Sequence, residues 1–520
     1  MGDAGGRGTY DCHGGALMPS PIVVCGENIF VTVRILERPA RMSVNVCPMG
    51  GTPMSKPIPP LDLSWLLIES PAGTTHVGAM LLFKKPAGRA PIVREIVEAY
   101  RACKPAPPFN YVPELLGRGA PHFREVTSWD PYYHVGHLAL PARASYDDLL
   151  RLVADLHEPQ LDRDRPLFRC WVIDGVSDGM FAIYTKTHHS IIDGESGLKL
   201  LYAGLSTSDR RTVPTPAFAL GAPAPTPHPP MPLAGRIVDS IRGAITQVEA
   251  VNQVSFGALR KVFAGLVGSH LEGSLPFAAQ HAPTNEPLKI GRRFATLSLP
   301  LEEMREVGRH FGATLNDVAA TVVDAGLHNY LREADRAFAH PFIAMCPVSL
   351  RADDDTAIGT RVSAMFARLG EPGASVSERI RQVVDSVATC KKELGRLSNE
   401  AAMTYAVGLV ALAGLGASTH LDRIAHPACN LVISNVAGGK ETRYLNSARL
   451  LGIYPVSALA ASIGLNVTLA SYHDNMDFGF VANAAAIDDL PQLARCAREA
   501  YEELKEAAGT QSARSKRASS

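Results

Sequence analysis

Two adjacent histidines, His188 and His189, are followed after three residues by Asp193 and Gly194 in the segment "HHSIIDG". The run before it, "MFAIYTKT", alternates like a β-strand, and "SGLKLLYAGL" after it has helical spacing. Loops at the ends of rigid strands often carry reactive side chains. A histidine with a pKa near 6.5 can accept a proton from an alcohol or a thiol at neutral pH. The aspartate could stabilise the imidazolium or fix the loop through a distant arginine, and the residues alone leave both roles open.

For an arbitrary pair of adjacent histidines, two structural side chains and a turn aspartate are the ordinary interpretation. A zinc site on a helix commonly uses two histidines separated by three residues, and this pair lacks that spacing, so no metal site is predicted. The serine in "GESG" does not have the GxSxG spacing of a hydrolase nucleophile. The complete pattern at a strand-to-helix junction is more specific than the histidine pair alone.

A second polar pair, Asn316 and Asp317, stands at the start of a segment with helical spacing. Thr314 and Asp317 match the pattern [ST]xx[DE], which is typical of a capping box that begins a helix. This local role favours a structural interpretation of the aspartate. Asn316 is not needed for the cap, and it could lie near the reacting groups.

Composition excludes several classes of protein. The 520 residues are 46% hydrophobic and 20% charged, as in a globular protein, and they are enough for two or more domains. The 51 basic and 51 acidic residues give a net charge of zero, which argues against nucleic-acid binding through a global basic field. Nine cysteines are scattered without a CxxC pair, so we expect reduced cytosolic thiols rather than a zinc ribbon or a disulfide framework.

Strand-like and helix-like segments alternate along most of the chain. Asp-Gly pairs in "DGVSDG" predict a hairpin turn directly before the histidine motif. We expect strands at 75–83, 132–140, 167–175, 180–187, 294–301, 342–351, 429–436, 462–473 and 477–483, and helices at 90–103, 145–159, 301–311, 315–333 and 489–507. Such alternation predicts a mixed α/β fold.

Changes in composition divide the chain. Residues 213–232 contain eight prolines, which is typical of an extended linker. The sequence predicts the following parts: an extension at 1–53, disordered or upstream of a natural start at Met54; an N-terminal domain at 54–205; a Pro-rich linker and helical segment at 206–285; a C-terminal domain at 286–508; and a disordered tail at 509–520.

One long apolar stretch could be mistaken for a membrane span. Residues 401–421 contain no Asp, Glu, Lys or Arg and approach spanning length. Their glycines and many alanines contribute little transfer free energy, which favours a buried or membrane-surface helix. No secretory signal is visible near the start. We expect a cytoplasmic protein that associates peripherally with the inner membrane or with lipid droplets.

The motif and several segments around it resemble a known family. "HHSIIDG" is similar to the HHxxxDG motif of the CoA-dependent acyltransferases, which include chloramphenicol acetyltransferases and the condensation domains of peptide synthetases. The remaining segments resemble the bacterial wax ester synthase/diacylglycerol acyltransferase family, and they follow one another in family order over about residues 58–505. They are "PLDLSWLLIESPAGTTHVGAMLLF" (60–83), "RPLFRCWVIDG" (165–175), "LNDVAATVVDAGLHNYL" (315–331), "PVSLR" (347–351), "SNV" (434–436) and "YPVSALAASIGLNVTLASYHDNMDFGF" (454–480).

The resemblance implies a role for each residue of the motif. His189, the second histidine, corresponds to the family's general base, and His188 to a supporting residue. Asp193 corresponds to a residue that holds the loop, for which Arg351 is the candidate ion-pair partner, and Gly194 fits a tight turn. Asn316 and Asp317 match the family's ND motif near the substrate or the oxyanion, and "MDFGF" (476–480) matches a distal structural segment.

The resemblance also implies a fold and a reaction. We expect two chloramphenicol-acetyltransferase-like α/β domains with mixed sheets and an active site at their interface. The reaction would transfer a fatty acyl group from acyl-CoA to diacylglycerol or to a long-chain alcohol, without a cofactor. The alternatives are a condensation-type enzyme that uses carrier-tethered acyl groups and a non-catalytic lipid-binding protein.

Two segments depart from the family pattern. Gly359-Thr360 replaces the usual Gly-Asn, and the SNVPGP-like turn reads "SNVAGG" (434–439), without either proline. Neither segment contains the proposed base, so the departures bear on acceptor preference and loop geometry.

Overall fold

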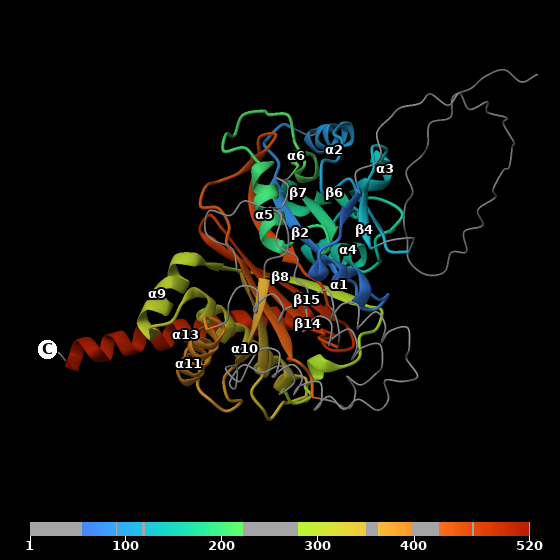
Figure 1. Cartoon of the computed structure of the whole chain (residues 1–520). Coiled ribbons are helices and arrows are strands. Elements are labelled where there is room, and N and C mark those ends of the chain that lie inside the picture. Colours follow the sequence, from blue (N-terminus) through green and yellow to red (C-terminus); the bar gives the residue numbers. More distant parts are fainter. Residues whose placement is uncertain are drawn as a thin grey trace, which may run out of the picture. The chain divides into compact units, whose positions relative to one another are not determined.

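Two mixed six-stranded sheets dominate the computed structural model (Figure 1). It describes residues 55–89, 91–116, 120–221, 279–349, 362–396, 426–459 and 462–518. In spatial order, the first sheet contains β12 (Tyr444–Leu445), β13 (Ala448–Val456), β2 (His76–Lys84), β7 (Met180–His188), β6 (Phe168–Val176) and β5 (Val135–Ala139). The second contains β10 (Val362–Arg368), β9 (Ile343–Ser349), β11 (Leu431–Val436), β14 (Leu465–Tyr472), β15 (Asn475–Asn483) and β8 (Arg292–Pro300).

Helices and a small sheet complete the described parts. The small sheet has the order β1 (Ser55–Pro57), β4 (His122–Glu125) and β3 (Tyr111–Glu114). The α-helices are α1 (Pro60–Ile68), α2 (Ile92–Ala102), α3 (Pro131–His134), α4 (Tyr146–His157), α5 (Gly194–Ala203), α6 (Ala217–Leu220), α9 (Leu301–Phe311), α10 (Leu315–Glu333), α11 (Val376–Leu394) and α13 (Leu490–Ala518). Both large sheets combine parallel and antiparallel pairs, so the predicted mixed α/β fold is confirmed.

Most of the predicted elements form because local signals and burial agree. The Asp-Gly turn joins β6 to β7 in an antiparallel pair, as predicted. Ser145 caps α4, since its hydroxyl accepts a hydrogen bond from the main-chain N–H of Asp148 at 3.2 Å. α13 begins as predicted but continues to Ala518, into the segment predicted to be a disordered tail. Alanine, glutamine, lysine and arginine make up most of residues 510–518 and are good helix formers, so they can extend the helix past Gly509.

Strand β7 separates two environments. Ile183, Thr185 and Thr187 line an apolar cavity beneath α5. The alternate residues point to the opposite face, where the Nζ of Lys186 donates to the carbonyl oxygen of Leu156 on α4. Because side chains alternate along a strand, His188 lies on the same face as Lys186.

The two large sheets are not separate along the sequence. β13 follows β11 of the second sheet in the chain, yet it pairs with β2 in the first sheet. Close to this crossover, Asp477 of β15 accepts hydrogen bonds from the Ser298 hydroxyl at 2.6 Å and from the main-chain N–H of Ile453 in β13 at 2.9 Å. Asp477 therefore ties the sheets together. The predicted boundaries at 54–205 and 286–508 remain predictions about domains, since strands of the later segment complete the earlier sheet.

Gly479 permits the close approach of β15 to β13. A Cβ atom at this position would lie 1.8 Å from the carbonyl oxygen of Pro455. We expect Gly479→Ala to force the strands apart and to lower the free energy of unfolding by about 1–3 kcal/mol, the usual range for overpacking. Urea denaturation would measure it. Gly373→Ala is the matched control, because a Cβ there meets no atom within 4 Å. Equal stability of the two variants would contradict the steric explanation.

No helix of the described residues is both long enough and apolar enough to cross a bilayer. The apolar stretch 401–421 lies outside the described residues, as do the extension at 1–53, most of the Pro-rich linker and Gly359-Thr360.

Candidate active site

The histidine motif lies at the end of β7, where the first sheet meets α5. The main-chain N–H of His189 donates to the carbonyl oxygen of Thr75 at 3.0 Å, which holds the loop beside the start of β2. Asp193 then caps α5, since its Oδ1 accepts a hydrogen bond from the N–H of Ser196 at 2.8 Å. The strand positions the histidines, and the helix begins immediately after them.

His189 is held against an aromatic ring. Its imidazole stacks on the indole of Trp65 in α1, with ring centroids 4.4 Å apart and planes 15° from parallel. Burial lowers the pKa of His189, while the carbonyl of its own main chain and the charge of Asp193 act in the opposite direction. The net lowering leaves the imidazole neutral at pH 7, which is the form that can accept a proton.

His188 faces the opposite way and is almost fully buried. Its Nδ1 accepts a hydrogen bond from the main-chain N–H of Ser190 at 3.1 Å, and its Nε2 lies 3.1 Å from the Thr75 hydroxyl. The structure therefore separates the adjacent histidines, with one in the protein interior and one beside Trp65. The interior position suits the predicted supporting role of His188.

Asp193 fixes the loop, and its charge also acts on His189. The side chain is 3% exposed and caps α5, and it raises the pKa of His189. The effect on His189 gives a physical basis to the first role left open by the residues, and the cap restrains the loop without an arginine. Arg351, the predicted ion-pair partner, lies outside the described residues, so that pairing stays a prediction.

Gly194 lies where the loop turns into α5. It is the first residue of the helix, and its φ is not among the positive values found in the described residues. A Cβ at this position would lie in ordinary contact, 3.7 Å from a methyl group of Val436 in β11. Asp193 precedes it in an extended conformation with φ −89° and ψ 169°, and the role of Gly194 as a turn residue stays a prediction.

Asn316 and Asp317 separate into different roles. Asp317 forms the predicted capping box, in which its Oδ2 accepts from the Thr314 N–H at 2.8 Å and from the Thr314 hydroxyl at 2.7 Å. Asn316 is exposed, and its Oδ1 accepts a hydrogen bond at 2.6 Å from the side-chain amide of Asn435 in β11. With the amide oxygen occupied in this way, the N–H₂ group of Asn316 remains as a donor.

Residues from both large sheets meet near the histidine loop. Val436 of β11, next to Asn435, lines the same cavity as Asp193 and Gly194. The second sheet therefore brings the Asn316–Asn435 pair towards the start of α5. The motif and the ND segment are more than one hundred residues apart in the sequence. Strand β11 links them, since Val436 lies beside Gly194 and Asn435 bonds to Asn316.

An apolar cavity of about 110 Å³ extends below the loop, between α5 and the face of β7 that carries Thr185 and Thr187. Its walls come from strands β2, β6, β7 and β13 and from helices α5 and α6; they include Val77, Leu81, Phe168, Cys170, Leu198 and Phe218. Apolar walls with few polar groups are typical of sites that bind hydrocarbon. A reactive loop at one end of such a cavity suits a substrate with a polar head and an apolar chain.

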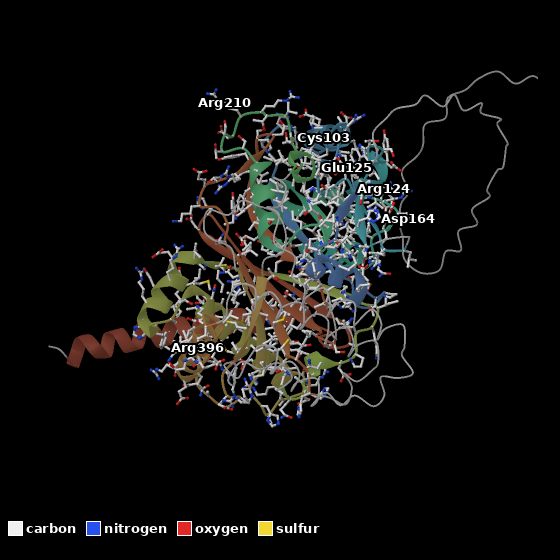
Figure 2. All side chains as sticks on the ribbon, viewed as in Figure 1. Cys103, Arg124, Glu125, Asp164, Arg210 and Arg396 are labelled. Atoms are coloured by element: carbon white, nitrogen blue, oxygen red, sulfur yellow. The ribbon has the colours of Figure 1, made fainter. Side chains whose placement is uncertain are left out.

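A second cavity, beside the small sheet, is polar. Arg124 and Arg165 line it together with Asp164 (Figure 2 labels Arg124 and Asp164). Both arginines already form ion pairs, Arg124 with Glu114 and Arg165 with Asp162. Because carboxylates already neutralise both arginines, the cavity does not offer a net positive charge to an anionic ligand. We therefore assign no function to this cavity.

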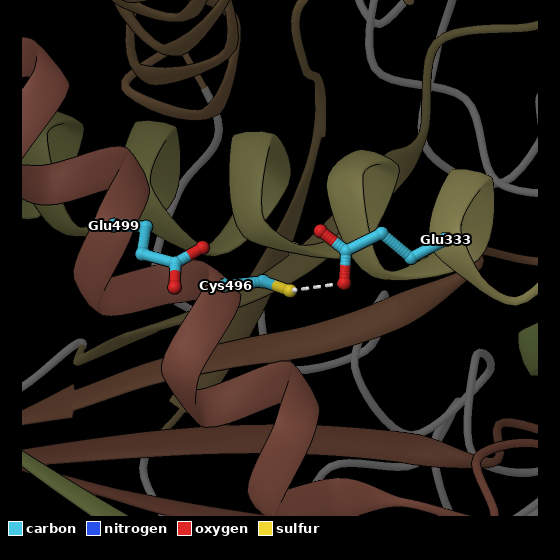
Figure 3. A group of neighbouring side chains, drawn as sticks. All are labelled: Glu333, Cys496 and Glu499. Atoms are coloured by element: carbon cyan, nitrogen blue, oxygen red, sulfur yellow. Dashed lines mark hydrogen bonds between the residues drawn. The ribbon is translucent and has the colours of Figure 1, made fainter.

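Within the described residues, one group approaches the geometry of a metal site. Possible ligand atoms of Glu333, Cys496 and Glu499 lie within 4.8 Å of one another (Figure 3). Burial and the neighbouring glutamates raise the pKa of the Cys496 thiol to about 11, and the thiol donates to Glu333 at 3.7 Å. Glu333 and Asn316 lie at opposite ends of α10, so this group connects α10 to α13 away from the candidate site.

Sequence reasoning did not assign a role to three residues that hold the histidines. Trp65, Glu69 and Thr75 lie within the family-like segment 60–83, but no spacing rule links them to a motif over 100 residues later. One signal could have pointed to Glu69. It directly follows the apolar segment "LSWLLI", and a carboxylate buried beside such a segment needs a specific partner.

Comparisons with known proteins agree with this geometry. Residues 58–319 match the family model of the wax ester synthase/diacylglycerol acyltransferase catalytic domain, and residues 358–505 match that of the WS/DGAT C-terminal domain. A probable diacylglycerol O-acyltransferase of Mycobacterium tuberculosis, Tgs4, is 33% identical over 475 residues, covering 88% of this chain and 98% of the relative. A putative diacylglycerol O-acyltransferase of the same species is 31% identical over 486 residues, covering 86% of this chain and 97% of the relative.

Solved structures give the same result for the fold. The wax ester synthase/diacylglycerol acyltransferase from Marinobacter aquaeolei VT8 superposes with a TM-score of 0.69 at 26% identity, covering 87% of this chain and 100% of that one. The first condensation domain of the CDA synthetase has a TM-score of 0.50 at 18% identity, covering 87% and 97%, and it shares the fold alone. With both family models matched and relatives above 30% identity over most of their length, this chain belongs to the wax ester synthase/diacylglycerol acyltransferase family.

Proposed function

We propose that this protein transfers a fatty acyl group from acyl-CoA to the hydroxyl group of diacylglycerol, a long-chain alcohol or both. The observation that carries the proposal is a neutral histidine, His189, in the loop whose following residues Ile192 and Asp193 line an apolar cavity. Membership of the family and the names of the relatives support the same reaction.

The chemistry follows from the state of His189. A neutral imidazole has one ring nitrogen without a proton, which can act as the acceptor. This nitrogen removes the proton of the acceptor hydroxyl as its oxygen attacks the thioester carbonyl. The tetrahedral intermediate then expels the CoA thiolate, which takes the proton back from the imidazolium. The products are an ester and free CoA, and no cofactor is required.

Two further groups would assist these steps. The negative charge of Asp193, which raises the pKa of His189, stabilises the imidazolium formed during attack. The amide N–H₂ of Asn316, whose oxygen is held by Asn435, is a candidate donor to the developing oxyanion.

The central test is a competition between acceptors. Purified protein is mixed with palmitoyl-CoA and equal amounts of diacylglycerol and hexadecanol, and both CoA release and the lipid products are measured. We expect triacylglycerol, wax ester or both, with CoA released in equal amount. Absence of CoA release with either acceptor would refute the proposal and favour a lipid-binding protein. Transfer from an acyl carrier protein but not from acyl-CoA would favour a condensation-type enzyme.

The cavity predicts a preference for acyl chain length. Cys170 of β6 is 2% exposed and lines its wall. We expect Cys170→Phe to fill much of the cavity and to lower kcat/KM for palmitoyl-CoA by about 10–200-fold relative to octanoyl-CoA, as expected when a pocket loses room for chain methylenes. Cys170→Ala, which adds no volume, is the control. An unchanged chain-length profile in a folded Cys170→Phe enzyme would show that the acyl chain lies elsewhere.

The substrates also suggest where the protein acts. Diacylglycerol and long-chain alcohols partition into lipid, so we propose that the protein works at the surface of a membrane or a lipid droplet. Flotation of the purified protein with diacylglycerol-containing vesicles would test this, and protein that stays at the bottom of the gradient would contradict it.

A further inference from the structure

A buried carboxylate lies behind the histidine motif. Glu69 follows the last residue of α1, and its side chain is 1% exposed. Its Oε2 lies 2.9 Å from an Nη of Arg163 and 3.7 Å from Nε2 of His188, and its Oε1 lies 3.0 Å from Nε2 of His76. A negative charge at the C-terminal end of a helix is unfavourable for the helix dipole. Helix stability therefore does not explain Glu69, but its partners do.

The hydrogen bonds of His188 define one tautomer. A main-chain N–H can only donate, so the bond from Ser190 requires an unprotonated Nδ1. The proton of the neutral ring is therefore on Nε2, which faces Thr75 and Glu69. A carboxylate near an N–H group stabilises the tautomer that directs the proton towards it.

The same ring anchors the catalytic loop. The unprotonated Nδ1 of His188 accepts from the main-chain N–H of Ser190, the residue after His189. The main-chain N–H of His189 itself donates to the carbonyl oxygen of Thr75. The Thr75 hydroxyl in turn donates to the carbonyl oxygen of Trp65 at 3.1 Å, and Trp65 stacks on the base. The other tautomer of His188 would lose the bond from the main-chain N–H of Ser190 and keep only the contact of Nδ1 with the Ser190 hydroxyl at 2.8 Å, which holds the side chain rather than the main chain of the loop.

From this arrangement we infer that Glu69 is a positioning residue, which fixes the Nε2–H tautomer of His188 and thereby the placement of His189. The inference rests on the proposed function. It names a contribution from α1, far from the motif in the sequence, to the geometry of the base.

The protonation states are consistent with this role. Burial alone would raise the pKa of Glu69, but the neighbouring side chains of His188 and His76 lower it well below its usual range, so the carboxylate is charged. Burial lowers the pKa of His76 to about 4 and also lowers that of His188. Both histidines are then neutral at pH 7, and Arg163 is the cation that balances Glu69.

Glu69→Gln keeps the shape of the side chain and removes its charge. We expect kcat to fall about 10–100-fold, the range typical of groups that orient a functional histidine from behind, while KM for acyl-CoA changes less than threefold. Asp324→Asn is the matched control, because Asp324 is a fully buried carboxylate on α10. Removal of the Asp324 charge should lower the free energy of unfolding and leave the kcat of the folded enzyme unchanged.

A folded Glu69→Gln enzyme with the kcat of the wild type would overturn the inference. If Glu69→Gln does not fold, Glu69→Asp is the second test. Aspartate keeps a negative charge for Arg163, but its side chain is one methylene shorter, so the carboxylate lies farther from His188. We expect Glu69→Asp to fold and to lose about tenfold in kcat, and full activity would overturn the inference.

A second readout does not depend on turnover. Long-range ¹H–¹⁵N spectra of histidine-labelled protein, with the signal assigned through His188→Asn, report the tautomer directly. The Nε2–H form in the wild type and its loss in Glu69→Gln would support the inference, and the Nδ1–H form in the wild type would overturn it. A wild-type protein that releases no CoA but shows the Nε2–H form would refute the proposed function and leave this positioning of His188 supported.

Discussion

Replacement of His189 by alanine is expected to slow CoA release by about 10²–10⁴-fold, the contribution of a positioned general base. The imidazole of His189 has a lowered pKa, stacks on Trp65 and belongs to the loop that contributes Ile192 and Asp193 to the cavity wall. Alanine removes the proton acceptor without adding volume to the site. The measurement is the initial rate of CoA release with palmitoyl-CoA and the better of the two acceptors.

Two further variants make this result specific. His137→Ala removes an exposed histidine of β5 and should retain the wild-type rate. His188→Ala should lose activity through misplacement of the loop, since His188 holds Ser190 and faces Glu69. A rate within threefold of the wild type in folded His189→Ala would exclude the histidine as the base.

Local parts of this site could be predicted from the sequence because their causes are local. The alternation of "MFAIYTKT" predicts a strand, and the strand delivers the histidines at its end. Thr314 and Asp317 are three residues apart, and their capping box forms as the spacing predicts. Asp193 caps α5, which is a local arrangement too, while its predicted ion pair with Arg351 stays a prediction.

Long-range parts of the site could not be predicted in this way. The hydroxyl of Thr75 and the ring of His188 are 113 positions apart, and their contact depends on the pairing of β2 with β7. Strand β13 is another example, because no local signal specifies that it joins the first sheet rather than the second. Such pairings result from which apolar faces can be buried together, and a single sequence does not specify them.

Gly194 shows what a local motif leaves open. Asp193 caps α5 and Gly194 is its first residue, so the two together lead the chain from the loop into the helix. A Cβ at Gly194 would only be in ordinary contact with Val436, so neither the helix nor the packing explains why glycine is found here.

Arg379→Met is expected to destabilise the second half of the protein by about 3–5 kcal/mol, the usual effect of removing one partner of a buried ion pair. Arg379 of α11 is 3% exposed and forms a short ion pair with Asp324 of α10, which is 0% exposed. It also donates to the carbonyl oxygens of Gly370 and Pro372, each at 3.2 Å. Methionine has a similar length and is apolar, so the variant fills the space but leaves the carboxylate unpaired.

The stability lost in Arg379→Met should depend on pH, because Asp324 changes its protonation state. Burial raises its pKa to about 6, although the charge of Arg379 acts against this shift. The folded state therefore binds this proton more tightly than the unfolded state, and its contribution to stability is present at low pH and is lost as the pH rises through about 6. Without Arg379 the pKa rises further, so urea denaturation should show a larger deficit at pH 8 than at pH 5. The double variant with Asp324→Asn should recover much of the stability, because no buried charge then lacks a partner. A small deficit of equal size at both pH values would mean that Asp324 is solvated when Arg379 is removed.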